Sequence, residues 1–332
     1  MKKKYIWMVL GIVGIFLTAA CGQPQAEKAD DTVLKIGYSG SLCEAPVHIA
    51  LEKGFFEKEG LKVDLIKLAP GTAFEAVTAG QVDAGFGLLS SLIQPLSNGL
   101  PIKITSGLHT GCDKVLAPKD SAIKTLGDLK GKRIGVPSMN SSPIIFAKRA
   151  LADAGINVTE KNPEVEFVVF GPSELALALQ RGAVDALAMN DPTASVAMKE
   201  NNLVTLADSA VTPPYNTQYC CTAYVRDNIA AEHPEIAAKY TRAMQAASAW
   251  IAEHQDETAK IQVEKKWVPG DPVFNAAILK TYNYIPSAKG AYDAFSITAK
   301  QLQQVGMLDD KVDVESLQKN SFLLFDEKEG IR

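Results

Sequence analysis

The sequence predicts an α/β protein with two similar lobes. A series of strand, helix, strand, helix and strand begins near Val33 and returns about 100 residues later. The segments "AGQVDAGF" and "RGAVDALA", which contain Asp83 and Asp185, match each other in the two series. Because β-α-β units build parallel sheets, each series predicts one sheet with its helices. A repeat this long indicates a duplicated domain rather than a solenoid.

The elements of the first series follow one another without long loops. "VLKIGYSG" alternates like a strand, "APVHIALEKGFFEKEG" has helical spacing that ends at Gly60, and "LKVDLIKL" is typical of a second strand. "TAFEAVTAGQVDAGFG" predicts a helix, a glycine turn and a third strand. This order predicts a sheet whose three strands run parallel.

The second series repeats this order. "IGVPSMNSSPIIFAKRALADAG" predicts a strand and a helix, "VEFVVFG" a strand, and "SELALALQRGAVDALAMNDP" a helix and a strand. Ile36-Gly37 corresponds to Ile134-Gly135 in this comparison. Asp83 and Asp185, in matching positions, are therefore interpreted as structural turn residues rather than ligands.

The first twenty residues have the layout of a secretory signal, with three lysines, an apolar run and small residues before Cys21. "LTAAC" is similar to a bacterial lipobox, although Thr18 stands where the usual pattern has leucine. We expect residues 1–20 to be removed and residues 21–32 to form a polar tether with a lipid on Cys21. An ordinary signal peptide with an incidental cysteine is the alternative.

Charge and composition narrow the class of partner. The formal net charge is −4 and becomes more negative once the lysines of the signal are removed. An acidic chain does not suit the phosphate backbone, so we expect no nucleic-acid partner. The 47% hydrophobic content can supply two lobes of ordinary size.

The candidate binding site lies where the carboxyl ends of the predicted strands meet. Ligands of open parallel sheets bind there, next to the free N–H groups of helix N-termini. The loops concerned are residues 39–46 and 87–91 of the first lobe, with 137–143 and 188–192 of the second. Asp191 also suits a turn before Pro192. The candidate ligand-binding residues in these loops are Cys43, Glu44, Ser90, Ser91, Asn140, Ser141, Asn190 and Asp191.

Several of these segments carry a family resemblance. "ALEKGFFEKEGLKVDLIKL", "AGQVDAGFG", "LPIKITSGL", "DSAIKTLGDLKGKRIGVP" and "ALQRGAVDALAMNDP" resemble the solute-binding components of ABC importers in the nitrate, taurine, alkanesulfonate and thiamin-precursor group. The resemblance implies a two-lobed fold of the periplasmic-binding-protein type II class, with a hinge of two crossover strands. It also implies a lipid-anchored monomer outside the cytoplasmic membrane, without a cofactor, that passes a small-molecule solute to a permease and its ATPase.

The resemblance also implies where the lobes divide. Residues 33–114 and 225–332 are expected in lobe 1, and residues 115–224 in lobe 2. The crossover strands are then "CDKVLAP", which begins at Cys112, and "CCTAYVRD", which begins at Cys220 and Cys221. These cysteines are therefore expected to be neighbours at the back of the cleft.

Four cysteines follow Cys21, and three interpretations of them stay open. They can form two disulfides, with three connectivities, although adjacent Cys220 and Cys221 can bridge only through a strained ring. They can be inert buried thiols. They can also line the cleft and bind a thiophilic metal or organometallic species, with Cys43, Cys112 and His109 contributing. Because neighbouring strand residues point to opposite faces, the last interpretation needs a bulge at Cys220 and Cys221.

An enzyme is the interpretation of another class. The fungal thiamin-pyrimidine synthase shares the fold class and carries a cysteine cluster on a comparable strand, which "YCC" partly matches. The longer cysteine run is missing here, and neither a Ser-His-Asp order with supporting context nor a nucleophile elbow is found. We therefore expect a receptor without catalytic residues, whose solute is a thiophilic species or, alternatively, an oxyanion, a sulfonate or a pyrimidine.

Overall fold

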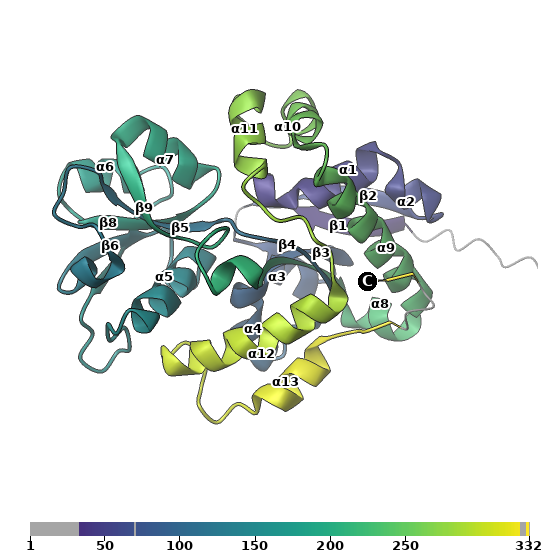
Figure 1. The fold of residues 1–332 in the computed structure, drawn as a ribbon. Coiled ribbons are helices and arrows are strands. Elements are labelled where there is room, and N and C mark those ends of the chain that lie inside the picture. Colours follow the sequence, from purple (N-terminus) through teal and green to yellow (C-terminus); the bar gives the residue numbers. More distant parts are fainter. Residues whose placement is uncertain (1–32, 70, 326–329, 332) are drawn as a thin grey trace, which may run out of the picture. The chain divides into compact units, whose positions relative to one another are not determined.

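A computed structural model describes residues 33–69, 71–325 and 330–331 of the chain, all within one compact unit. The expected signal, tether and lipidated Cys21 lie outside the described residues. In the described part, ten strands form two five-stranded sheets, with helices packed against them (Figure 1). The fold is thus α/β, as the sequence predicts.

The first sheet has the strand order β2-β1-β3-β10-β4. Strand β1 runs parallel to β2 and β3, whereas β10 runs antiparallel to both β3 and β4. The strands of this sheet are β1 (Val33–Tyr38), β2 (Lys62–Lys67), β3 (Ala84–Leu88), β4 (Ile102–Thr110) and β10 (Tyr219–Arg226).

The second sheet repeats this plan in the order β7-β6-β8-β5-β9. Strand β6 is parallel to β7 and β8, and β5 is antiparallel to β8 and β9. Its strands are β5 (Asp113–Pro118), β6 (Arg133–Val136), β7 (Glu166–Val169), β8 (Ala186–Asn190) and β9 (Leu203–Asp208).

Helices follow the strands in the order expected from the two series. The predicted helical segment 45–60 is divided into α1 and α2 by Gly54, whose φ of 66° is accessible to glycine at little cost. The α-helices are α1 (Ala45–Glu52), α2 (Phe55–Lys58), α3 (Ala73–Thr78), α4 (Leu89–Ser97), α5 (Ser142–Asp153), α6 (Leu175–Gln180), α7 (Thr193–Asn201), α8 (Asp227–Glu232), α9 (Pro234–Ile251), α10 (Gln255–Glu264), α11 (Pro272–Leu279), α12 (Ala288–Gln304) and α13 (Val314–Ser321).

Three short 3-10 helices complete the list, and one of them belongs to a predicted cleft loop. They are η1 (Leu42–Glu44), η2 (Leu126–Leu129) and η3 (Tyr215–Thr217). Helix η1 leads directly into α1, so it fixes the loop that follows β1.

The duplication is confirmed by the strand register. Ile36 and Gly37 of β1 pair with β3 as Ile134 and Gly135 of β6 pair with β8. The two matching aspartates also act alike. The carboxylate of Asp83 accepts the backbone N–H of Lys35, and that of Asp185 accepts the N–H of Arg133. Both therefore hold strand ends together, as the sequence predicts.

The strand pairing differs from the expected division of the chain. The expected second lobe included residues 219–224, but these belong to β10 and pair with both β3 and β4 of the first sheet. Residues 113–114, expected in the first lobe, begin β5 of the second sheet. Strand β10 pairs with β3 and β4, and strand β5 pairs with β8 and β9. Because each lies between two strands, its backbone N–H and C=O groups are hydrogen-bonded on both sides, which favours this placement.

Apolar side chains fill the space between the sheets and their helices. Tyr224, Tyr240, Phe56 and Phe295 are the largest side chains buried in this way. In the described ranges, we find no helix that combines the length and apolar character needed to span a bilayer.

Candidate functional site

A cavity of about 210 Å³ lies at the carboxyl ends of β1 and β3. The predicted loop 39–46 and the predicted loop 87–91 both contribute to its walls, and Asn190 at the end of β8 contributes from the second sheet. Four aromatic side chains also line it: Tyr38, Phe74, Phe86 and Tyr224. Loops from both predicted series therefore meet around one cavity.

Two smaller cavities continue this space. One of about 130 Å³ is lined by Phe74, Ser90, Ser91 and Asn140 among others. Another of about 30 Å³ is lined by Ser90, Cys220 and further polar side chains. Because neighbouring cavities share lining residues, they form a series from β1 to the start of β10.

Glu44 borders the largest of these three cavities, and its carboxylate is already satisfied. It accepts hydrogen bonds from the backbone N–H groups of Ser39, Gly40 and Ser41, at 2.7–2.8 Å, and from the Ser39 hydroxyl. Burial raises the pKa of Glu44, and the hydrogen bonds act against that shift. The structure therefore places Glu44 as the residue that shapes the loop before η1.

Three cysteine thiols converge where the two sheets meet. The Sγ atoms of Cys112 and Cys220 lie 2.9 Å apart, and Cys221 donates a hydrogen bond to the sulfur of Cys220 at 3.6 Å. All three sulfur atoms lie within 4.8 Å of one another, a spacing that suits one metal ion. All four cysteines of the described residues are free thiols. The expectation that Cys112 and the Cys220-Cys221 pair are neighbours is confirmed.

Two backbone irregularities bring these thiols together. The pairing of β10 with β4 shifts register between Tyr219 and Cys221 and again between Cys221 and Thr222. This bulge lets adjacent cysteines share one side, as the sequence argument requires. Cys112 has a φ of 148°, a strained value for a residue with a side chain. Its N–H donates to the Ser209 hydroxyl at 3.0 Å, which fixes it against the second connection between the sheets.

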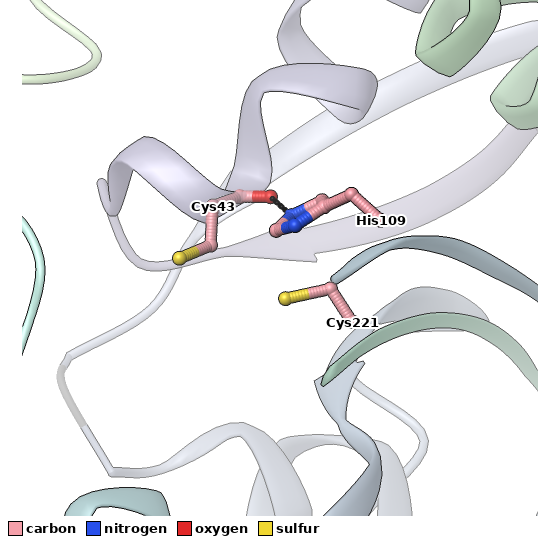
Figure 2. A group of neighbouring side chains, drawn as sticks. All are labelled: Cys43, His109 and Cys221. Carbon is pink, nitrogen blue, oxygen red and sulfur yellow. Dashed lines mark hydrogen bonds between the residues drawn. The ribbon is translucent and has the colours of Figure 1, made fainter. Parts of the chain in front are cut away.

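Cys43 and His109 form a second group with Cys221, shown in Figure 2. Cys43 lies in η1, and its thiol donates to the Tyr282 hydroxyl at 3.9 Å. His109 on β4 stacks on Tyr282, and its Nε2 lies 3.1 Å from the carbonyl oxygen of Cys43. Figure 2 shows the imidazole directed at this carbonyl oxygen and not at either sulfur. His109 therefore positions the loop that carries Cys43.

The thiols differ in acidity. Hydrogen bonds from Cys112 and Cys221 lower the pKa of the Cys220 thiol, while burial acts in the opposite direction. The hydrogen bond to Cys112 contributes most to raising the pKa of Cys43 to about 12, and burial raises the pKa of Cys221. The pKa of Cys220 is thus lowered, whereas the pKa values of Cys43, Cys112 and Cys221 are raised.

The remaining predicted residues have separate places. Ser91 lines two cavities, and its buried hydroxyl oxygen has no hydrogen-bond partner in the described structure. Asn140 is exposed, and Ser141 is the N-cap residue of α5, where its hydroxyl donates to the Ser138 carbonyl oxygen. Asp191 is buried in an ion pair with Lys114, and its other oxygen accepts from Ser195. The structure thus brings together Cys220, Ser90 and Ser91 around the connected cavities, but not Ser141 or Asp191.

Sequence analysis missed the polar groups around the smallest cavity. Arg149 is buried there, and its guanidinium donates to the side-chain oxygens of Gln218 and Gln301 rather than to a carboxylate. Asp113 lines the same cavity and accepts from Ser142, while its Oδ1 is buried without a partner. Asp113 directly follows Cys112, and this adjacency was the available signal.

The fold and the site can now be set beside known proteins. The model of the NMT1/THI5 like family matches residues 44–258. The chain belongs to this family. A Bacillus subtilis (strain 168) protein named "Putative aliphatic sulfonates-binding protein" is 29% identical over 97% of this chain and 96% of its own length.

Two further proteins that resemble the chain have different names. The 4-amino-5-hydroxymethyl-2-methylpyrimidine phosphate synthase of Aspergillus parasiticus is 24% identical over 72% of each chain. The alkanesulfonate-binding protein SsuA from Xanthomonas axonopodis pv. citri, solved with MOPS bound, superposes with a TM-score of 0.70 at 20% identity, covering 88% of this chain and 98% of its own. The fold is therefore that of periplasmic binding proteins, and the chain is similar in sequence both to a protein named as a binding protein and to one named as an enzyme.

Proposed function

We propose that this chain is the extracytoplasmic solute-binding subunit of an ABC importer. It captures a small molecule between its two sheets and delivers it to a permease that an ATPase drives, while it stays a lipid-anchored monomer. The relative from Bacillus subtilis, which matches nearly the whole chain, supports the receptor class. The 210 Å³ cavity, walled by loops of both sheets, supports the mode of capture.

The cluster of cysteine thiols is the observation that favours a thiophilic solute. Thiolates select soft cations, whereas carboxylates and carbonyls suit hard ones. Cys43 opens on the 210 Å³ cavity, and Cys221 links it to Cys112 and Cys220. We therefore favour a thiophilic metal or organometallic species as the solute of this receptor.

A sulfonate or other oxyanion is the second candidate, favoured by the names of the relatives. The walls of the 210 Å³ cavity include Glu44 but neither lysine nor arginine. A buried carboxylate at the wall opposes an anion. A pyrimidine would avoid this conflict, and in both cases the cysteines would be structural.

An enzyme of the synthase type is the candidate of another class, favoured by the Aspergillus parasiticus relative. It predicts turnover or a covalently altered product when the purified protein is incubated with pyrimidine precursors. A receptor predicts that each bound solute is released unchanged, as judged by mass spectrometry.

Binding of the right solute should raise the melting temperature. A ligand that binds only the native state stabilises it by RT ln(1 + [L]/Kd), about 2.7 kcal/mol at a hundredfold excess over Kd. We would screen thiophilic metals, methylmercury, sulfonates, oxyanions and pyrimidines by differential scanning fluorimetry.

Ser91→Phe should abolish the shift in melting temperature for a solute that binds in the 210 Å³ cavity, because Ser91 is on its wall. Ser296→Phe, at a partly exposed serine of α12, is the matched control. A ligand-free protein that responds to none of these compounds would contradict the receptor assignment.

Cys21→Ser should release the protein from the membrane. A lipidated cysteine anchors the mature chain, whereas the signal alone is removed on export. Fractionation of cells that produce either chain, followed by a carbonate wash, measures the difference. Cys43→Ser serves as the control, since Cys43 is buried in the folded unit. Retention of the Cys21→Ser chain in the washed membrane would contradict the lipid anchor.

A further inference from the structure

We propose that Cys112, Cys220 and Cys221 form a three-thiolate site for a single soft metal cation that binds bare, without organic substituents. The inference rests on the proposed function, because it names the chemical class of the solute and the side chains that hold it. Cys43 and His109, which form the neighbouring group, are not ligands of this ion.

The distances between the sulfur atoms suit such a site. Metal–thiolate bonds of about 2.3 Å place three coordinating sulfurs roughly 4 Å apart. The three Sγ atoms already lie within 4.8 Å of one another, with two of the separations at 2.9 and 3.6 Å. An entering ion needs to part Cys112 and Cys220 by about 1 Å, and the other positions change less.

The surrounding volume selects a bare ion. Cys112 and Cys221 have no exposed surface, and the cavity at Cys220 measures about 30 Å³. A cavity of this size holds about two water molecules, at roughly 10–15 Å³ for each. An aryl or long alkyl group on the metal has no room there, and none of the three thiols lines the larger 210 Å³ cavity, which has Cys43 on its wall.

The charges around the thiols also suit a cation bound by thiolates. Binding of a divalent ion by three thiols releases three protons and leaves one net negative charge. Arg149 and Asp113 both line the same small cavity as Cys220, so the Arg149 guanidinium faces the buried Asp113 carboxyl as well as the thiols. The guanidinium donates to amide oxygens, and the Oδ1 of Asp113 is buried without a partner in the described structure. Since the backbone strain at Cys112 and the bulge at Cys220 both serve to bring sulfurs together, the site is built before the ion arrives.

The site also connects the two sheets. Cys112 precedes β5 of the second sheet, and Cys220 and Cys221 belong to β10 of the first. An ion bound to all three therefore ties the connection between β4 and β5, where Cys112 lies, to strand β10 of the first sheet. Its binding couples directly to the relative position of the sheets, which a receptor of this class uses for capture and release.

Cadmium is the probe for this site. The full-length chain, purified in detergent, reduced with a phosphine and stripped of metal, is titrated with Cd²⁺ while the cadmium–thiolate charge-transfer absorption is recorded. We expect one ion per chain, and X-ray absorption at the cadmium edge should count three sulfur neighbours. Cys112→Ser, Cys220→Ser and Cys221→Ser should each weaken binding at least about 100-fold. Cys43→Ser is the matched control and should keep both the stoichiometry and the three-sulfur shell.

The outcomes separate the site from the proposed function. A shell of oxygen and nitrogen atoms in the wild-type protein, or a loss in Cys43→Ser as large as in the other variants, would overturn the three-thiolate site. The X-ray absorption measurement on the wild-type protein tests the three-sulfur site even if a variant fails to fold. If cadmium binds through three sulfurs but cells lacking the protein accumulate Cd²⁺ and Cu⁺ at the wild-type rate, the importer function fails and the site stands. If a sulfonate binds and Cd²⁺ does not, the receptor stands and this site fails.

Discussion

Replacing Lys114 with methionine should destabilise the folded protein by about 3–5 kcal/mol, because it leaves buried carboxylates without their counter-charge. The Nζ of Lys114 lies 2.6 Å from Oδ2 of Asp191 and 3.4 Å from Oδ2 of Asp208. The side chains of Lys114 and Asp191 are 6% and 0% exposed. Burial acts to lower the pKa of Lys114, but the two aspartates outweigh it and raise that pKa. Lys114 is therefore charged in the folded protein.

Urea unfolding at neutral pH measures this loss, with Lys289→Met as the matched control. Lys289 pairs with Asp293 on the surface of α12, where the two side chains are 82% and 55% exposed. Exposed pairs contribute about 0–1 kcal/mol, so the control should unfold close to the wild type. If both substitutions change the unfolding free energy equally, the buried pair of Lys114 and Asp191 stabilises the protein no more than an exposed pair does.

Acid should destabilise the protein through His48, by about 2–3 kcal/mol between pH 6.5 and pH 4.5. His48 is fully buried, and burial lowers its pKa from 6.5 to about 3. Below pH 6.5 the unfolded chain binds a proton at this residue and the folded chain does not. The stabilisation is therefore present above pH 6.5 and is lost as the pH falls toward about 3.

The surroundings of His48 explain why it stays neutral. Its Nδ1 pairs with the Gln262 amide at 3.0 Å, its Nε2 is buried without a partner, and its ring stacks on Trp267 at 4.6 Å. His48→Phe keeps the stacking and removes the titration, so its unfolding free energy should change less between pH 6.5 and pH 4.5. His233→Asn, at a partly exposed histidine, is the control. An identical pH slope in wild type and His48→Phe would contradict the assignment.

The fold was predictable from the sequence because local patterns decide most of it. The duplicated β-α-β series is visible in hydrophobic periodicity, and Asp83 and Asp185 mark the same strand end in both halves. The place of β10 was not predictable in this way. Its residues are mostly apolar and do not alternate, as in a strand buried on both faces. Only the register with β3 and β4 shows that residues 219–224 complete the first sheet.

The candidate site was predictable in part for similar reasons. The proximity of Cys112 and Cys220 is what the family resemblance implies. A site that uses both Cys220 and Cys221 requires a bulge, and β10 has one there. The identity of other polar groups depends on tertiary packing. Asp191 sits in a loop that should face the cleft, yet the buried Lys114 draws its carboxylate inward. Arg149 lies in the middle of α5, where periodicity indicates only a helix face.

The position of β10 determines the order in which the two sheets can be completed as the chain is synthesised from the N-terminus onward. The strands of the second sheet, β5 to β9, are contiguous, so all of them are available once residue 208 has appeared. Strands β3 and β4 appear earlier but lack the strand that lies between them until residue 226. The half that begins first is therefore finished last. Throughout that interval, unpaired strand edges of β3 and β4 are open to other chains, so aggregation is favoured at this stage of folding.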